Sequence, residues 1–266
     1  MAKKYLGQNF LFDTYILSNI IGSTDVGPED IVVEIGPGPG KLTRMLAEKA
    51  GRVIAIELDD RLYERLRIEL AGADNIELVH GDALRYHYED LPEFKVVANI
   101  PYYITTPIIF RLLQAKGSLK SMTLAVQKEV AERITAKPDT KAYGVLSLMV
   151  RYYAEPDLRF LIPKEAFRPK PKVDSAVVNM RILDKPSVDV KDEKLFFRII
   201  KTAFSQRRKM LSNSLKSLRE DVKEWLSRAG IDPQRRPETL SIREFALLAN
   251  TFDEGGRAKT LILRES

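Results

Sequence analysis

The chain has 266 residues, of which 44% are hydrophobic and 30% are charged, as expected for a globular protein of one large domain or two unequal ones. It contains no cysteine and two histidines, which excludes disulfides and thiol nucleophiles and argues against a metal site or a Ser-His-Asp triad, so we expect no bound metal. Residues 1–184 carry 25 basic and 25 acidic side chains and residues 185–266 carry 18 and 12, so the net charge of +6 lies in the C-terminal third.

The first two-thirds of the sequence alternate between short β-rich runs and helical patterns. Strands are expected at 30–35, 52–56, 76–79, 95–98 and 122–126, and helices at 41–50, 60–70, 106–113 and 128–136. This alternation is typical of βαβ units that form an open parallel sheet. Two further apolar runs, 145–153 and 175–182, predict an added antiparallel pair of strands.

A polar break at 183–187 separates this pattern from a helical C-terminal third. We therefore expect two domains, an α/β domain over 1–184 and a smaller all-helical domain over 185–266. No apolar run approaches the roughly 18 residues of a membrane span, and the basic N-terminus lacks the apolar core of a signal peptide. These features predict a cytoplasmic protein without membrane association.

A glycine-rich loop lies between the first expected strand and the first expected helix. Its sequence, Gly36-Pro37-Gly38-Pro39-Gly40, lets the backbone approach a ligand closely. The spacing is neither the G-x-G-x-x-G of a dinucleotide site nor a P-loop, and the two prolines remove backbone donors. The loop therefore favours a ligand without a pyrophosphate, and the alternative is a simple tight turn.

Acidic residues follow the next two expected strands. Glu57 ends the second strand, where a carboxylate can accept hydrogen bonds from both hydroxyls of a ribose. Asp82 and Ala83 follow the third, where a carboxylate can accept from the amine of an adenine. Together with Gly36 and Gly38, these residues predict a site for S-adenosylmethionine.

The fourth expected strand ends in Asn99-Ile100-Pro101-Tyr102. An adenine amine is a poor nucleophile because its lone pair is delocalised into the ring. The Asn99 side-chain oxygen and the Ile100 carbonyl can accept hydrogen bonds from that amine and free the lone pair. Pro101 would fix the turn, and Tyr102 offers a face for stacking a flipped base. We predict that these residues are catalytic, and the alternative is an ordinary strand followed by a proline turn.

Five segments of the chain together resemble the rRNA adenine N6-methyltransferase family. These segments are residues 8–11, 34–43, 81–83, 99–107 and 167–176. The resemblance implies the Rossmann-like sheet of a class I S-adenosylmethionine methyltransferase. It also implies that Asn9, Leu11 and Asn99 contact the cofactor, and that Phe167 helps hold the flipped adenine opposite Tyr102.

Two C-terminal segments, 203–215 and 236–245, are similar to the branch of that family that modifies the small ribosomal subunit. The resemblance implies dimethylation at N6 of two adjacent adenosines in a hairpin loop near the 3′ end of 16S-type rRNA during ribosome biogenesis. The expected partners are small-subunit rRNA and the pre-ribosomal small subunit, and we expect a monomer. The alternatives are a large-subunit rRNA adenine methyltransferase of the macrolide-resistance type and a non-catalytic RNA-binding assembly factor on the same fold.

Three consecutive cations, Arg207, Arg208 and Lys209, follow an apolar helical stripe in the C-terminal third. On a helix they would fan over roughly 200°, so at least one must project outward. We predict that they bind rRNA phosphates. The alternative is a solvated face, or arginines that pair with acids of the first domain.

Overall fold

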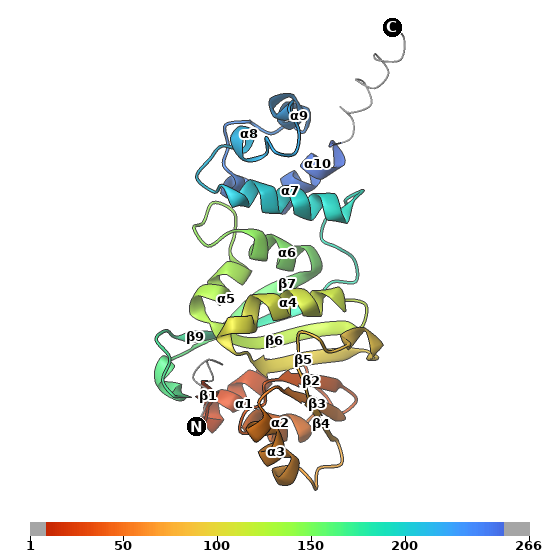
Figure 1. The fold of residues 1–266 in the computed structure, drawn as a ribbon, viewed down its shortest axis with the longest axis vertical. Coiled ribbons are helices and arrows are strands. Elements are labelled where there is room, and N and C mark those ends of the chain that lie inside the picture. Colours follow the sequence, from red (N-terminus) through yellow and green to blue (C-terminus); the bar gives the residue numbers. More distant parts are fainter. Residues whose placement is uncertain (1–8, 253–266) are drawn as a thin grey trace. The chain divides into compact units, whose positions relative to one another are not determined.

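The computed structural model describes residues 9–252, so residues 1–8 and residues 253–266 of the expected second domain lie outside it (Figure 1). Contacts divide the chain into two units, residues 1–132 with 155–182 and residues 133–154 with 183–266. The segment 133–154, expected in the α/β domain, groups with the helical C-terminal part. Among the described residues, no helix is both long and apolar enough to cross a membrane.

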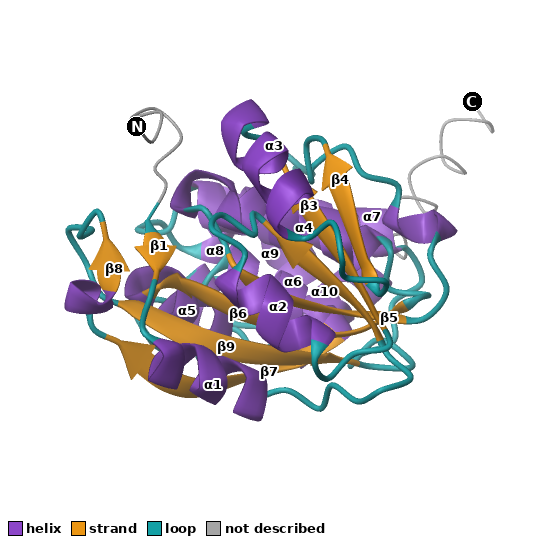
Figure 2. Cartoon of the chain, turned by 90° about the horizontal axis from the view of Figure 1, so that it is seen from below, coloured by secondary structure: helices purple, strands orange, loops and turns teal. Residues whose placement is uncertain are grey.

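The first unit is built on a seven-stranded sheet with the order β4-β3-β2-β5-β6-β9-β7 (Figure 2). The five parallel strands are β2 (Ile31–Ile35), β3 (Arg52–Glu57), β4 (Ile76–His80), β5 (Phe94–Asn99) and β6 (Leu119–Gln127). β9 (Ser175–Ile182) runs antiparallel to β6, and β7 (Ala154–Ile162) lies beyond it. Because the strand order reverses between β2 and β5, the carboxyl ends of these strands flank the crevice where such sheets bind ligands.

Four helices lie where the sequence predicts them: α2 (Lys41–Ala47), α3 (Asp60–Glu69), α4 (Thr105–Gln114) and α5 (Lys128–Thr135). A further helix that was not predicted, α1 (Thr14–Gly22), precedes β2. Side-chain caps begin two of them, because Asp13 accepts from the backbone amides of the first turn of α1 and Asp59 does the same for α3. Short 3-10 turns lie at Tyr88–Asp90, Tyr102–Ile104, Lys164–Ala166 and Pro237–Thr239.

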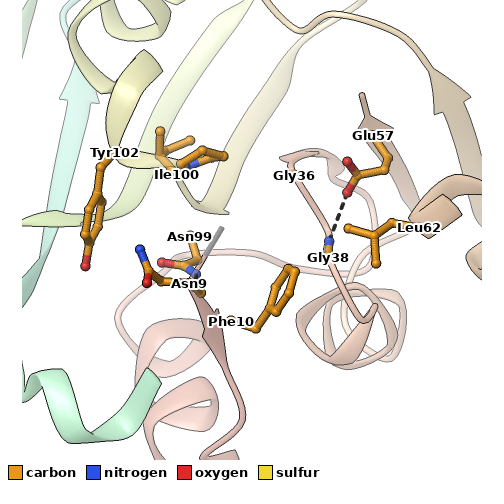
Figure 3. Close-up of a pocket in the computed structure, with 10 residues that line it drawn as sticks. Asn9, Phe10, Gly36, Gly38, Glu57, Leu62, Asn99, Ile100 and Tyr102 are labelled. Atoms are coloured by element: carbon orange, nitrogen blue, oxygen red, sulfur yellow. Dashed lines mark hydrogen bonds between the residues drawn. The ribbon is translucent and has the colours of Figure 1, made fainter. Parts of the chain in front are cut away.

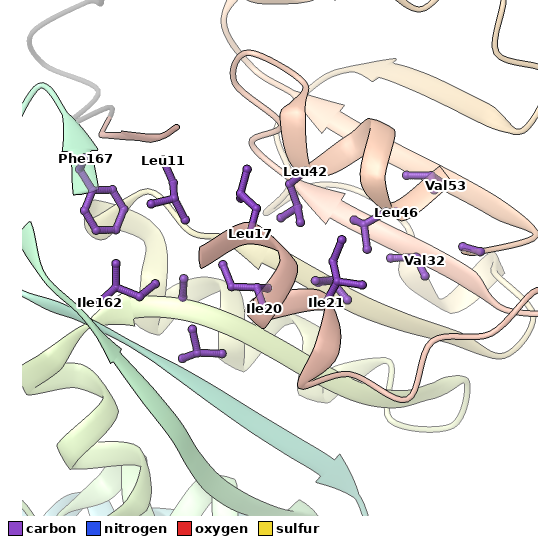
Figure 4. Close-up of a cluster of buried hydrophobic side chains, with 14 residues drawn as sticks. Leu11, Leu17, Ile20, Ile21, Val32, Leu42, Leu46, Val53, Ile162 and Phe167 are labelled. Carbon is purple, nitrogen blue, oxygen red and sulfur yellow. The ribbon is translucent and has the colours of Figure 1, made fainter. Parts of the chain in front are cut away.

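A two-stranded sheet holds the start of the described chain against the rest of the first unit. It pairs β1 (Phe10–Leu11) antiparallel with β8 (Phe167–Arg168), so that Leu11 lies opposite Phe167 and Phe10 opposite Arg168. Successive side chains of a strand point to opposite faces. Leu11 and Phe167 therefore share one face, where they join the buried cluster that α1 and α2 form with the main sheet (Figure 4).

The second unit, as far as it is described to residue 252, is built from helices and the loops between them. Its helices are α6 (Val145–Tyr153), α7 (Glu193–Ser205), α8 (Leu211–Ser214), α9 (Val222–Arg228) and α10 (Ile242–Asn250). The prediction of a strand at 145–153 is wrong, because this segment is α6. Six of its nine residues are buried, so no polar face reveals the helical period, and its β-branched and aromatic residues imitate a strand. The antiparallel strand 175–182 is confirmed, but its neighbours are β6 and β7.

Candidate active site

A pocket with an empty volume of about 400 Å³ opens at the carboxyl ends of β2 and β5 (Figure 3). Eight of the residues predicted from the sequence line it: Asn9, Gly36, Gly38, Glu57, Asn99, Ile100, Pro101 and Tyr102. A second pocket of about 580 Å³ is also lined by Gly36, Glu57 and Pro101, and it extends to Asp82 and Ala83 after β4. The parallel sheet thus gathers residues from four strand ends into two adjoining pockets.

The glycine loop requires glycine at its alternate positions. Gly36, Gly38 and Gly40 all have φ between +57° and +76°, in the left-handed region that side chains disfavour. A Cβ atom at Gly38 would lie 2.8 Å from the Phe10 ring, and one at Gly40 would lie 2.6 Å from Leu66. The loop is therefore packed between β1 and α3 with no room for a side chain.

Glu57 links the glycine loop to the end of β3. One carboxylate oxygen accepts the Gly38 amide at 3.2 Å, the dashed line in Figure 3, and the other accepts the Asp59 amide at 2.8 Å. The side chain is 5% exposed, and its burial raises the pKa of Glu57 above the usual value. Each oxygen still has a lone pair for a ribose hydroxyl, so Glu57 can both hold the loop and bind a ligand.

Asp82 lies at the far end of the second pocket. Its Oδ1 accepts the Leu84 amide at 2.9 Å, while its Oδ2 is 4.0 Å from the Arg85 guanidinium. The side chain is about one-third exposed, so Oδ2 can accept a hydrogen bond from an adenine amine. Tyr103, which the sequence analysis did not assign, lines the same pocket.

Asn99 has an orientation that its partner fixes. Its Nδ2 donates to the backbone carbonyl of Asn9 at 3.1 Å, and a carbonyl can only accept, so the amide cannot be flipped. Oδ1 accepts no hydrogen bond from the residues of the described range. Figure 3 shows the two asparagine side chains between the Tyr102 ring and the Gly38 loop. Within residues 9–252, the Asn99 Oδ1 is therefore available to accept a hydrogen bond from a ligand.

Tyr102 is anchored by a residue that the sequence analysis missed. Its hydroxyl lies 2.7 Å from the hydroxyl of Ser175, which is fully buried in β9. Burial raises the pKa of Tyr102, so the phenol stays neutral. This hydrogen bond holds the edge of the ring and leaves its face for stacking. Nothing in the local sequence marks Ser175, because it reaches Tyr102 only when β9 pairs with β6.

Phe167 and Leu11 are both core residues, and Leu11 also lines a smaller pocket that it shares with Asn99 and Gly36. Phe167 is 1% exposed and Leu11 is 6% exposed, and both belong to the buried cluster beside α1 (Figure 4). The β1–β8 register turns both side chains to the core face. The structure therefore does not bring Phe167 opposite Tyr102, whereas Phe10, which the sequence analysis did not assign, lines the pocket.

Glu34, near the end of β2, is a further residue that the sequence analysis did not assign. It is 2% exposed, and its Oε2 has no hydrogen-bond partner among the described residues. Burial, aided by the nearby charge of Glu57, raises the pKa of Glu34 to about 8. It lines a smaller third pocket together with Asn99 and Lys41. A buried carboxyl oxygen without a partner is costly, so this position fits a ligand that carries an ammonium group.

The predicted RNA-binding cations lie beyond α7 rather than on it. The helix ends at Ser205, and Arg207 to Lys209 occupy the turn that follows, so the expected helical fan is wrong. Arg207 donates to the carbonyls of Lys141 and Tyr143 at 2.9 and 3.0 Å. Its partners are thus backbone groups of its own unit, while Arg208 and Lys209 remain exposed.

Comparisons with known proteins show the family to which the chain is similar. The profile of the family described as ribosomal RNA adenine dimethylase matches residues 1–254. The chain is 48% identical to ribosomal RNA small subunit methyltransferase A of Caldanaerobacter subterraneus, over 94% of this chain and 97% of that protein. It is 47% identical to the protein of the same name from Clostridium acetobutylicum, over 93% and 92%.

Two solved structures have the same fold over most of their length. A dimethyladenosine transferase from Plasmodium falciparum superposes with a TM-score of 0.79 at 28% identity, over 93% of this chain and 98% of that one. The 23S rRNA methyltransferase ErmE superposes with a TM-score of 0.73 at 29% identity, over 92% and 100%.

Proposed function

The chain belongs to the ribosomal RNA adenine dimethylase family, and we propose that it dimethylates N6 of two adjacent adenosines in a hairpin loop near the 3′ end of 16S-type small-subunit rRNA. It is an S-adenosylmethionine-dependent rRNA adenine N6,N6-dimethyltransferase of ribosome biogenesis. The observation in the site that best supports this function is the orientation of Asn99, whose Nδ2 donates to the Asn9 carbonyl and whose Oδ1 accepts no hydrogen bond from the described residues.

S-adenosylmethionine supplies a methyl group that its sulfonium already activates, so the protein must bind and orient rather than generate a reactive species. Glu57 would bind the ribose hydroxyls and Asp82 the adenine amine, at the ends of neighbouring strands. Gly36 and Gly38 allow the backbone to approach the ligand. Glu34, with its unpartnered oxygen, would hold the ammonium of the methionine part.

Asn99 and Ile100 would act on the target adenine. The transition state develops positive charge on N6, so the site needs hydrogen-bond acceptors rather than donors. The Asn99 Oδ1 is one acceptor, because the Asn9 carbonyl holds the amide nitrogen, and the Ile100 carbonyl is the other. Both acceptors draw the amine toward a tetrahedral geometry and free its lone pair for the methyl group.

Tyr102 would stack on the flipped adenine, while Pro101 holds the turn between it and Asn99. A base stacked on an aromatic ring gains roughly 1–3 kcal/mol, which offsets part of the cost of removing it from its own stack. The Tyr102–Ser175 hydrogen bond fixes the ring before the base arrives. Phe167, which the resemblance places on the other side of the adenine, is buried in the core of the structure.

The substrate that we propose is the pre-ribosomal small subunit, on which a monomeric enzyme acts in the cytoplasm. Arg207, Arg208 and Lys209, which are all exposed, would contact rRNA phosphates. Such contacts add affinity with little sequence information, so the pocket of Asn99 and Tyr102 selects the base.

The test incubates the protein with labelled S-adenosylmethionine and ribosomal subunits that lack these methyl groups. We expect label in the small subunit, recovered after digestion as N6,N6-dimethyladenosine. Label in the large subunit would instead indicate the macrolide-resistance type of activity. Binding to small subunits without any label would indicate a non-catalytic assembly factor.

A further inference from the structure

A shallow hollow in the second unit shares no lining residue with the pockets at the strand ends. Its cavity volume is about 490 Å³, within the range of small-molecule sites. Met149 of α6 and Phe197 of α7 supply apolar surface, and Lys194, Arg198 and Lys201 of α7 supply three cations. The hollow therefore combines an aromatic ring with clustered positive charge.

The three cations, which we call the α7 ridge (Lys194, Arg198 and Lys201), form one face of the helix. Their spacing of four and three residues places them within an arc of roughly 60° and spreads them over roughly 10 Å of helix. The opposite face is the buried one, with Phe196 and Ile199 among its residues. All three ridge residues are exposed, and none of the ion pairs or hydrogen bonds among the described residues engages their side chains.

One acidic residue also lines the hollow. Glu193 accepts a hydrogen bond from the Tyr153 hydroxyl, and because that donor is neutral the carboxylate keeps its charge. Three cations against one carboxylate leave the lining with a net charge of +2. A surface of this kind attracts a polyanion.

Phe197 is held in place at the hollow by other rings. Its ring centroid lies 5.1 Å from those of Phe196 and Tyr152 and 5.8 Å from that of Tyr153. The side chain is nevertheless only partly buried. A rigid, partly exposed ring beside cations is the combination that single-stranded nucleic acids use, because bases stack on the ring while phosphates meet the charges.

We propose that this hollow is a second RNA-binding site, which takes a nucleotide of single-stranded small-subunit rRNA with its base on Phe197 and neighbouring phosphates on the α7 ridge. This inference rests on the proposed function, because it names a further surface by which the enzyme holds its rRNA substrate. The site acts in docking and takes no part in methyl transfer.

The test measures binding to small subunits that lack the methyl groups, over a series of salt concentrations. The variant replaces the α7 ridge with glutamine (Lys194→Gln, Arg198→Gln, Lys201→Gln). The matched control makes the same change of charge at three exposed cations elsewhere in the second unit, Lys216→Gln, Lys223→Gln and Arg243→Gln. Thermal unfolding checks that both variants are folded, and a second variant, Phe197→Leu, removes the ring alone.

We expect the ridge variant to bind at least about tenfold more weakly at moderate salt, with a log–log salt slope less negative by about 2, since three phosphate contacts on a single strand contribute roughly 0.7 each. The control variant should keep most of the parent affinity, and Phe197→Leu should weaken binding with an unchanged slope. Equal losses in the ridge and control variants would overturn the proposal.

A parallel measurement uses protein-free small-subunit rRNA. Loss of binding by the ridge variant to this RNA supports the proposal, whereas loss confined to intact subunits would assign the surface to a ribosomal protein and overturn it. The methylation assay with the parent protein tests the proposed function separately from the proposed RNA-binding hollow. A parent that methylates small subunits and a ridge variant that binds like the control refute the hollow alone.

Discussion

In the absence of cofactor, the Glu34→Gln variant should become more stable relative to the parent protein as the pH rises. Glu34 is buried at 2% exposure with an unpartnered oxygen, and its pKa is raised from 4.5 to about 8. A carboxyl with a raised pKa binds its proton more tightly in the folded state. The stability that it contributes is therefore complete below about pH 4.5 and is lost progressively until the pH passes about 8.

The magnitude follows from the displacement of the pKa. Each pKa unit corresponds to about 1.4 kcal/mol. Ionisation of Glu34 therefore lowers the unfolding free energy by about 3 kcal/mol at pH 7 and by about 5 kcal/mol above pH 8. Glutamine has the same shape and does not ionise. The difference in unfolding free energy between Glu34→Gln and the parent should thus shift by about 3 kcal/mol between pH 4.5 and pH 7, in favour of the variant.

Urea denaturation across this pH range, without cofactor, measures the difference directly. The test depends on how the difference in unfolding free energy changes with pH. Its value at any one pH also includes the cost of the new amide donors, which need hydrogen-bond partners of their own. Glu29→Gln is the control, since Glu29 is exposed. Parallel stability curves for Glu34→Gln and the parent would refute the assignment of Glu34 as a buried, unpartnered carboxyl.

Three further predictions concern the site and the cationic turn. Asn99→Ala should slow single-turnover methyl transfer roughly 100-fold or more while calorimetric affinity for S-adenosylmethionine changes little, and a normal rate would make Asn99 merely structural. Asp82→Ala should weaken cofactor binding about tenfold in the same titration, without changing the melting temperature, because the side chain is partly exposed. Arg207→Gln should cost about 1 kcal/mol of stability through its two lost hydrogen bonds, whereas Arg208→Gln should lie within about 0.5 kcal/mol of the parent and instead weaken subunit binding. Equal stability losses in these two arginine variants would contradict the structural role of Arg207.

The strand ends of the first unit could be predicted because the relevant signals are local. A buried apolar run followed by Gly36, Glu57, Asp82 or Asn99 marks the end of a parallel strand, and parallel strands bring all such ends to one edge of the sheet. The sequence therefore predicted most of the pocket lining before any contact was known. The family resemblance added Asn9, which no periodicity would have placed.

The sequence is least informative where tertiary contacts override local pattern. Residues 145–153 resemble a strand because burial on most sides of α6 removes the polar face of a helix. The family resemblance predicts Phe167 at the adenine, and its strand pairing with Leu11 places the side chain in the core of the structure. Arg207 was grouped with its neighbours by charge, although the carbonyls that hold it come from residues more than 60 positions earlier. None of these partners is visible in the local sequence.

The β1–β8 pairing also has a consequence for the order in which the protein is made. Asn9 and Phe10 form one wall of the pocket, and this wall is held by the pairing of β1 with Phe167 and Arg168 of β8. Those two residues are synthesised long after Asn9 and Phe10. Pairing β1 with β8 closes a loop of more than 150 residues, which costs conformational entropy. A ladder of two residues is too short to offset this cost, so other contacts must form first. The main sheet supplies those contacts, so the wall closes only after β6 has joined β5. A nascent chain that has not yet reached Arg168 would therefore possess the five parallel strands and the glycine loop, but it would lack β9 and could not yet hold Asn99 in its working orientation.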